Sequence, residues 1–297
     1  MGAELILRRG RSDDLPAVER ICTQTWDWGD YVPLVWEEWL ADPQGFVLVG
    51  EIEGQAVALS KITFLAADQV WLSGMRVDPA FRGRGVAGRF LDYGIDYACQ
   101  QGARVVRLAT GDTNAPVHTL AHRAGMSCLG SFAVGRAESL PEGDLPVVLA
   151  PEHEPQVRAL LDQGSILRQA RGLYSVHWTW QELSPERVAQ FLAHGQMVAR
   201  IDAQGQMRAL ASVHLDPVDE EMWIGFVEGD PDSVEWLARA VRAHAAQVGA
   251  EALEVMLADV DSLRDAFHAA GYVTDDQEGE LLIFEKRLTR DGQGHGE

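Results

Sequence analysis

Two glycines and two arginines lie between a predicted strand, Val70–Val77, and a predicted helix, Val86–Cys99. The loop reads Arg82-Gly-Arg-Gly-Val-Ala87, and Arg89 follows in the first turn of the helix. Glycine allows positive φ and a close approach of the backbone to a ligand. Backbone N–H groups at a helix start bind anions, and arginines add positive charge. This spacing predicts a site for a phosphate-containing ligand.

The overall charge narrows the choice of partner. The chain has 297 residues and a formal net charge of −20. Such an acidic chain repels nucleic acids and anionic membrane surfaces, so we expect neither as a partner. The arginine-rich loop reverses this sign locally, which favours an anionic cofactor. An acidic surface is also compatible with a cationic or amine-bearing substrate.

The three cysteines, Cys22, Cys99 and Cys128, have no paired spacing. This argues against a disulfide framework or a zinc site and for a reducing compartment. No uncharged run is long enough to span a bilayer, and the start of the chain lacks the layout of a signal peptide. We therefore expect a cytoplasmic protein.

The length allows two domains of ordinary size. In the first half, the predicted order is strand, helix, short helix, three strands, the glycine loop with its helix, strand, helix and strand. Asn114 opens the last of these helices and Gly125 ends it. The aromatic segment from Trp26 to Tyr31 is equally compatible with a place in the hydrophobic core and with a binding loop.

This order and the loop resemble the GNAT superfamily of acetyl-CoA-dependent N-acetyltransferases. The family's cofactor motif is Gln/Arg-x-x-Gly-x-Gly/Ala, and Arg82–Ala87 matches it. The preceding Val-x-Pro-x-x-Arg string, the later Asn114 and the pair Gly125-Met126 also match. More loosely, Gly29-Asp-Tyr-Val-Pro33 and Trp39-Leu-x-Asp-Pro43 are similar to the vertebrate histidine N-acetyltransferase group.

The resemblance implies direct attack of an amine on the thioester of acetyl-CoA, with no metal. Asp27, Asp30, Glu37 and Glu38 could anchor the ammonium of the acceptor, and the looser resemblance favours Asp30 and Tyr31. Ser73 is a further candidate substrate contact, and the pantetheine arm is expected near Asn114. The residues expected to contact acetyl-CoA are Met75, Arg76, Val77, Arg82, Gly83, Arg84, Gly85, Val86, Ala87, Gly88 and Asn114.

The sequence departs from the family at two positions. The usual tyrosine acid is replaced by Ala121, and Trp71 stands where some members carry a glutamate base. His118, one turn after Asn114, is the candidate catalytic acid, although a surface role is the simpler interpretation. His118 and His122 lack the third ligand that a metal site needs.

The second half resembles a degenerate copy of the first. Strands are predicted over Gln196–Ile201, Gln206–Leu215 and Glu221–Val227, with a helix from about Asp232 to Val248. Where the first copy has its glycine loop, the second has Glu228-Gly-Asp-Pro-Asp-Ser233. Its carboxylates and its proline, which lacks an N–H, disfavour a phosphate.

The predicted fold class is α/β (α+β), with two GNAT-type domains in tandem. Each domain is expected to have a mixed, mostly antiparallel sheet flanked by helices. The expected bounds are 1–138 for the catalytic domain, 146–290 for the degenerate one and 291–297 for a flexible tail. His177 or His214 of the second domain could reach the acceptor pocket.

The predicted function is acetyl transfer from acetyl-CoA to the amine of a small molecule or amino acid. Two alternatives stay open. One is a non-catalytic sensor or scaffold that binds acetyl-CoA, because both usual proton-transfer residues are missing. The other is acetylation of a protein side chain or N-terminus. The sequence does not indicate an oligomeric state.

Overall fold

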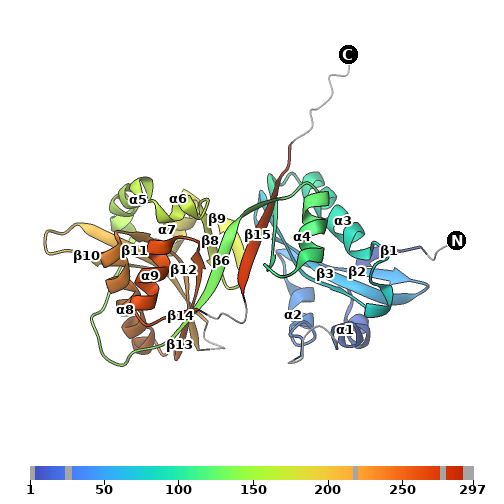
Figure 1. The fold of residues 1–297 in the computed structure, drawn as a ribbon, viewed down its shortest axis with the longest axis horizontal. Coiled ribbons are helices and arrows are strands. Elements are labelled where there is room, and N and C mark those ends of the chain that lie inside the picture. Colours follow the sequence, from blue (N-terminus) through green and yellow to red (C-terminus); the bar gives the residue numbers. More distant parts are fainter. Residues whose placement is uncertain (1–3, 24–28, 217–219, 275–278, 290–297) are drawn as a thin grey trace, which may run out of the picture. The chain divides into compact units, whose positions relative to one another are not determined.

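The computed structural model describes residues 4–23, 29–216, 220–274 and 279–289, which form two compact units (Figure 1). Of these residues, unit 1 contains 4–23, 29–110, 114–128 and 284–289, and unit 2 contains the rest. The helices and strands up to the end of α4 are β1 (Ile6–Arg9), α1 (Leu15–Cys22), α2 (Trp36–Ala41), β2 (Gly45–Ile52), β3 (Gln55–Ala66), β4 (Gln69–Val77), α3 (Val86–Gln100), β5 (Val105–Gly111) and α4 (Ala115–Arg123), with short 3-10 turns at Ser12–Asp14 and Pro79–Phe81.

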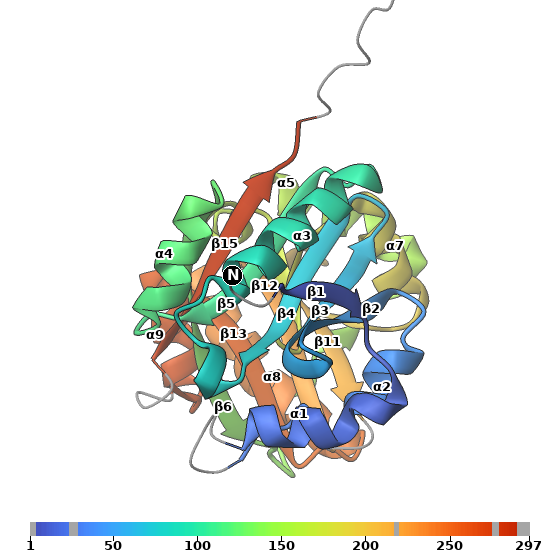
Figure 2. The same cartoon turned by 90° about the vertical axis from the view of Figure 1, so that its right-hand side faces the viewer.

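The strands of unit 1 follow the order β1-β2-β3-β4-β5-β15, where β15 (Glu280–Arg287) is the last strand of the chain. Strands β1 to β4 pair in antiparallel fashion, whereas β4 and β5 are parallel. Helices α1 and α2 pack on one face through a cluster that includes Ile21, Trp36 and Leu59. Helix α3 covers the other face, where Leu72 lies against Gly94 (Figure 2).

Strand β4 separates from β5 after the first third of its length. The pairs between them run only from Gln69↔Val105 to Trp71↔Arg107. On its other side, β4 stays paired with β3 up to Val77, but the register shifts where Ser60 faces both Gly74 and Met75. Two residues opposite one form a β-bulge, which bends a strand and re-aims its groups. The second half of β4 therefore borders an opening in the sheet.

The last strand of the chain completes the sheet of unit 1. The guanidinium of Arg107 donates to the Glu285 carboxylate from Nε and Nη2, both at 2.7 Å, and to Gln69 Oε1 at 2.7 Å. The two charged side chains are only 1% and 5% exposed. The N–H of Leu288 donates to the carbonyl of Arg104 at 2.8 Å. Residues 284–288 thus belong to a sheet formed mainly by the first 110 residues.

The same strand supports helix α4. Phe284 is buried and contacts the rings of His118 and His122, at centroid distances of 5.6 and 5.4 Å. Lys286 Nζ donates to the carbonyl of Ala124 at the end of α4, at 2.7 Å. The position of α4 in unit 1 therefore depends on residues near the end of the chain.

The strand that follows α4 joins unit 2 instead. Strand β6 (Ser127–Glu138) pairs with β13 from Phe132↔Ala258 to Glu138↔Ala252. The sequence-based bounds of 1–138 and 146–290 treat each domain as one continuous segment. The contacts group the described residues differently, with 111–113 and those of 129–283 in unit 2 and 284–289 in unit 1.

The strands of unit 2 follow the order β6-β13-β12-β11-β10-β7, with β14 beside β6. Strands β12 and β13 are parallel, and β12 carries a bulge at Gly225. The three predicted strands and the predicted long helix of this half are confirmed as β10, β11, β12 and α8. The elements are β7 (Val147–Val148), α5 (Glu154–Gln163), α6 (Ile166–Gln169), β8 (Leu173–Val176), β9 (Thr179–Glu182), α7 (Pro185–Ala193), β10 (Met197–Ile201), β11 (Met207–Asp216), β12 (Glu221–Gly229), α8 (Pro231–Gln247), β13 (Ala252–Ala258), α9 (Asp261–Ala269) and β14 (Val273–Thr274).

Replacing Glu285 with alanine tests the attachment of the last strand. The variant leaves the buried Arg107 charge without its carboxylate, which should lower the free energy of unfolding by about 3–5 kcal/mol. Urea denaturation followed by tryptophan fluorescence measures the change. The control is Arg158→Ala, which removes an exposed pair with Glu154 and should cost less than about 1 kcal/mol. Equal losses in the two variants would show that the buried Arg107–Glu285 ion pair does not hold the last strand in place.

Candidate functional site

The glycine loop of unit 1 lies at the N-terminus of α3 and borders open space. Gly83 and Gly85 adopt φ of +73° and +78°, and Gly85 is the N-cap of the helix. A Cβ added to either glycine would meet no atom within 4 Å. The first N–H groups of a helix have no partner within the helix. The loop therefore offers donors and positive dipole charge to a phosphate group.

Two arginines of the loop are exposed at its edge. Arg82 donates from Nε to the carbonyl of Val77 at 3.1 Å, and the guanidinium of Arg84 lies 4.9 Å from the ring centre of Phe81. Arg89 is exposed one turn into α3. These side chains can supply positive charge around an anion bound at the loop.

Arg76 has a different role from the other arginines. Its Nε donates to Asp30 Oδ2 at 2.7 Å and its Nη2 to Asp30 Oδ1 at 3.3 Å. The sequence suggested Arg76 for the cofactor and Asp30 for a substrate ammonium. In the structure each side chain holds the other, so an ammonium would have to compete with a guanidinium for Asp30.

The thiol of Cys22 lies close to the same ion pair. Burial, and secondly the negative charge of Asp30, raise the pKa of Cys22 to about 12. The thiol therefore stays protonated at neutral pH and is a poor nucleophile. Trp26 and Asp27, which the sequence offered as ligand contacts, lie outside the described residues.

Asn114 and His118 lie at the start of α4. The Asn114 side chain donates to Thr110 Oγ1 at 3.0 Å, and its carbonyl accepts the N–H of His118 at 3.1 Å. His118 is half-buried with its ring stacked on Phe284, whereas His122 is exposed. Ala121 is completely buried, so a tyrosine would not fit there without rearrangement of the core.

Ser73 and Trp39 lie near the bulge of β4. Ser73 is opposite Lys61 in the register, and Lys61 Nζ makes a 2.7 Å ion pair with Asp42. The Trp39 ring packs on Gly74, since a Cβ there would lie 2.4 Å from the indole. Sequence reasoning missed this contact, although a glycine within an apolar strand was its signal.

Residues 15–126 match the family described as Acetyltransferase (GNAT) family. Unit 1 contains a GNAT domain. This confirms the family resemblance that the sequence suggested. A human relative described as "Probable N-acetyltransferase 16" is 26% identical over 200 residues, which are 61% of this chain and 54% of that protein. The match thus spans about half the length of this curated relative.

Solved structures share the fold over nearly the whole chain. A GCN5-related N-acetyltransferase from Sphaerobacter thermophilus has a TM-score of 0.66 at 15% identity and covers 95% of each chain. A protein from Thermoplasma acidophilum has a TM-score of 0.59 at 16% identity, over 95% of this chain and 100% of that one. The α/β class with sheets flanked by helices is therefore confirmed.

In unit 2 the place of the glycine loop is occupied by the chain's own carboxylates. Asp230 accepts the N–H of Ser233 at 3.0 Å and caps α8, whose first residue is Pro231. Glu228 is buried and accepts N–H groups from the segment that starts α6, including that of Leu167 at 2.9 Å. At the start of α8, one N–H group is thus bound by Asp230 and another is missing at Pro231, which leaves a poor site for an anion.

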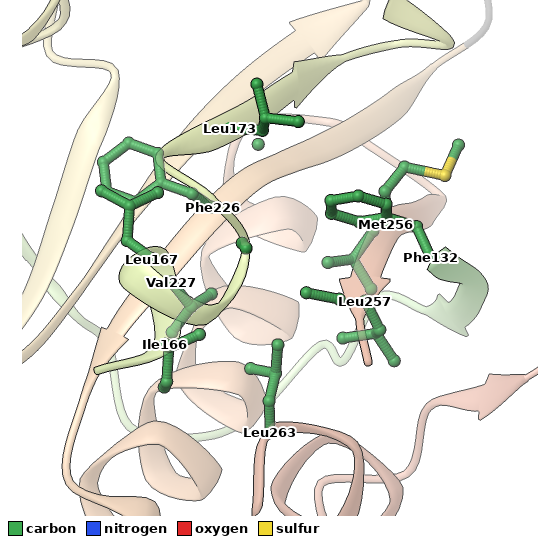
Figure 3. A pocket seen from close by; sticks show the side chains of 13 residues that line it. Phe132, Ile166, Leu167, Leu173, Phe226, Val227, Met256, Leu257 and Leu263 are labelled. Carbon is green, nitrogen blue, oxygen red and sulfur yellow. The ribbon is translucent and has the colours of Figure 1, made fainter. Parts of the chain in front are cut away.

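The opening between β12 and β13 in unit 2 is also filled. Ile166 and Leu167 of α6 lie beside Phe226 and Val227 of β12 and face Leu257 of β13 across the pocket (Figure 3). The remaining cavity has a volume of about 20 Å³, room for about one water molecule. This space is too small for the arm of a coenzyme.

The two histidines that the sequence suggested for the acceptor pocket lie together in unit 2. The ring centres of His177 and His214 are 5.6 Å apart, and His177 Nε2 is 3.9 Å from Asp216. Burial first, and then the neighbouring His177, lower the pKa of His214, while Asp216 opposes the shift. Within the described residues, no group of three or more His, Cys, Asp or Glu side chains could hold a metal ion.

The variant Gly164→Ala tests the packing around Glu228. A Cβ at Gly164 would lie 2.3 Å from the Glu228 carboxylate carbon. We expect a loss of about 1–3 kcal/mol in the free energy of unfolding, measured by urea denaturation. Gly130→Ala is the control, because a Cβ there meets no atom within 4 Å. If the two variants were equally stable, the Glu228 carboxylate would not be held tightly against Gly164.

Proposed function

We propose that unit 1 binds acetyl-CoA and transfers its acetyl group to the amine of a small molecule or amino acid. The observation that carries the proposal is the open loop at Gly83 and Gly85, located where β4 has separated from β5. The family match over residues 15–126 supports the same activity. Acetyl-CoA, when bound, supplies the activated acetyl thioester.

The backbone of unit 1 would hold the coenzyme. N–H groups of residues 82–88 and the α3 dipole would bind the pyrophosphate, with Arg82 and Arg84 neutralising charge. Met75 and Val77 lie in the half of β4 that lacks β5, where backbone N–H groups can stabilise developing negative charge on a carbonyl oxygen. Asn114 would hold the pantetheine arm beside β5.

Proton transfer must differ from the usual family pattern, because Ala121 and Trp71 are buried and have no acidic or basic group. We propose His118 as the acid that protonates the leaving thiolate, since its ring is oriented by Phe284. The thiol of a coenzyme is a tolerable leaving group, so catalysis does not require a tyrosine.

Unit 2 is proposed to be a degenerate copy that serves as support rather than as a second coenzyme site. Its Glu228 and Asp230 carboxylates and its filled opening favour this role. No helix among the described residues is long and apolar enough to cross a membrane. A cytoplasmic location remains a proposal, which rests on the lack of a disulfide among Cys22, Cys99 and Cys128.

A sensor that binds acetyl-CoA without turnover is the second candidate. The buried Ala121 and Trp71, in place of the usual proton-transfer residues, favour it. A panel of small amines and amino acids, followed by thiol release from acetyl-CoA, separates the two functions. Turnover of any amine supports the enzyme, whereas tight binding with no turnover supports the sensor.

The variant Gly85→Glu tests the coenzyme site. A side chain and a negative charge in the loop should raise the Kd of acetyl-CoA at least about a hundredfold. Calorimetric titration of the full chain measures this change. Gly54→Glu is a matched control, since Gly54 also has a positive φ (+79°) and open surroundings but lies in the β2–β3 turn. Micromolar binding by Gly85→Glu would disprove the assignment of the loop.

The variant His118→Ala tests the proposed acid. Loss of general acid catalysis should lower kcat about a hundredfold and flatten the alkaline side of the pH profile. His122→Ala is the control because His122 also packs on Phe284. An unchanged kcat and pH profile in His118→Ala would exclude the residue as the acid.

A further inference from the structure

The segment from Asp30 to Val35 is fixed to the second half of β4 by a buried ion pair. The side chains of Arg76 and Asp30 are 13% and 1% exposed, and the Asp30 carboxylate also accepts the N–H of Val32 at 3.0 Å. Val32 is fully buried below this pair. An ion pair this deep, with its remaining lone pairs used, holds the backbone in one place.

This fixed segment presents two large apolar side chains to solvent. Tyr31 is 40% exposed and Leu34 is 87% exposed. The N–H of Leu34 donates to the carbonyl of Tyr31 at 2.9 Å, so a turn brings the two residues together. Neighbouring exposed apolar side chains on a rigid segment are typical of binding surfaces. We call Tyr31 and Leu34 the acceptor patch.

The acceptor patch lies beside the bulge of β4. The Tyr31 ring meets the Trp39 ring edge-on at a centroid distance of 6.0 Å, and Trp39 packs on Gly74 of the bulge. The Arg76 guanidinium is 5.7 Å from the centre of the Tyr31 ring. Tyr31 is therefore close to the backbone at Met75 that would hold the acetyl carbonyl.

Two ion pairs with little exposure lie beside the patch, whereas Glu37 and Glu38 of α2 are exposed. Arg76 binds Asp30, and Lys61 binds Asp42. Burial alone would raise the pKa of Asp42, but hydrogen bonds from Lys61 and from the N–H of Gln44 lower it overall. The Asp42 carboxylate thus remains ionised and attached to Lys61. The charges of these two pairs are engaged with each other, and Tyr31 and Leu34 offer apolar surface to the body of an incoming amine.

We propose that the acceptor patch selects amines that carry an aromatic or aliphatic body, and that Arg76 and Asp30 are its positioning residues. The proposal rests on the proposed acetyltransferase function. The amine would enter with its apolar body on Tyr31 and Leu34 and its nitrogen toward the bulge of β4. Small hydrophilic amines gain nothing from this surface.

The experiment compares 2-phenylethylamine with ethanolamine, using the full chain. Thiol release from acetyl-CoA gives kcat and KM, and calorimetry on the CoA-loaded protein gives the Kd of each amine. The parent chain should prefer 2-phenylethylamine at least about tenfold in kcat/KM. The double variant Tyr31→Ser, Leu34→Ser should remove this preference by raising KM, with the Kd of acetyl-CoA unchanged. Leu145→Ser, which alters an exposed leucine of unit 2, is the control.

Asp30→Asn separates the positioning role from direct binding of the ammonium. As a positioning residue, Asp30 should, when replaced by asparagine, lower kcat/KM for 2-phenylethylamine about tenfold more than for ethanolamine. An equal loss for both amines would identify Asp30 as an ammonium ligand and overturn the proposal. So would a parent chain that prefers ethanolamine, or the absence of 2-phenylethylamine binding. Binding of 2-phenylethylamine at the patch without turnover would support the patch and refute the acetyltransferase function.

Discussion

The loss of pairing between β4 and β5 after Trp71 is the constraint on which the rest of unit 1 depends. A sheet that stayed fully paired would leave no backbone groups for a ligand. Beyond this point a bulge opposite Ser60 bends β4, while its pairing with β3 continues to Val77. The glycine loop follows this part of β4, Gly88 behind it lies near Leu120 of α4, and Trp39 beside the acceptor patch packs on Gly74.

The two units hold equivalent segments with opposite chemistry. Near the end of β4, Arg76 binds the side chain of Asp30, which precedes α2. Near the end of β12, Glu228 instead binds backbone N–H groups before and within α6. In unit 1 the loop before α3 is open. In unit 2, residues of α6 fill the opening between β12 and β13. Arg76 in unit 1 and Glu228 in unit 2 thus go together with an open and a filled opening of the sheet, respectively.

Local patterns predicted much of this structure, and long-range pairs did not. The glycine loop and the three strands of the second half follow from periodicity and turn residues within short windows. The partner of Arg107 lies 178 positions away at Glu285, and that of Arg76 lies 46 positions away at Asp30. A single sequence contains no signal that joins such residues. The pairing of β15 with β5 and the ion pair between Arg76 and Asp30 therefore could not be predicted from the sequence.

The position of β15 also has a consequence for biosynthesis. Strand β5 leaves the ribosome long before residues 284–288, since Arg107 and Glu285 are 178 positions apart. At about 5–20 residues per second, the edge of β5 waits roughly 10–35 seconds for its permanent neighbour. An unpaired strand edge invites pairing with other chains. The nascent protein thus passes through a period in which the edge of its first sheet is open to aggregation.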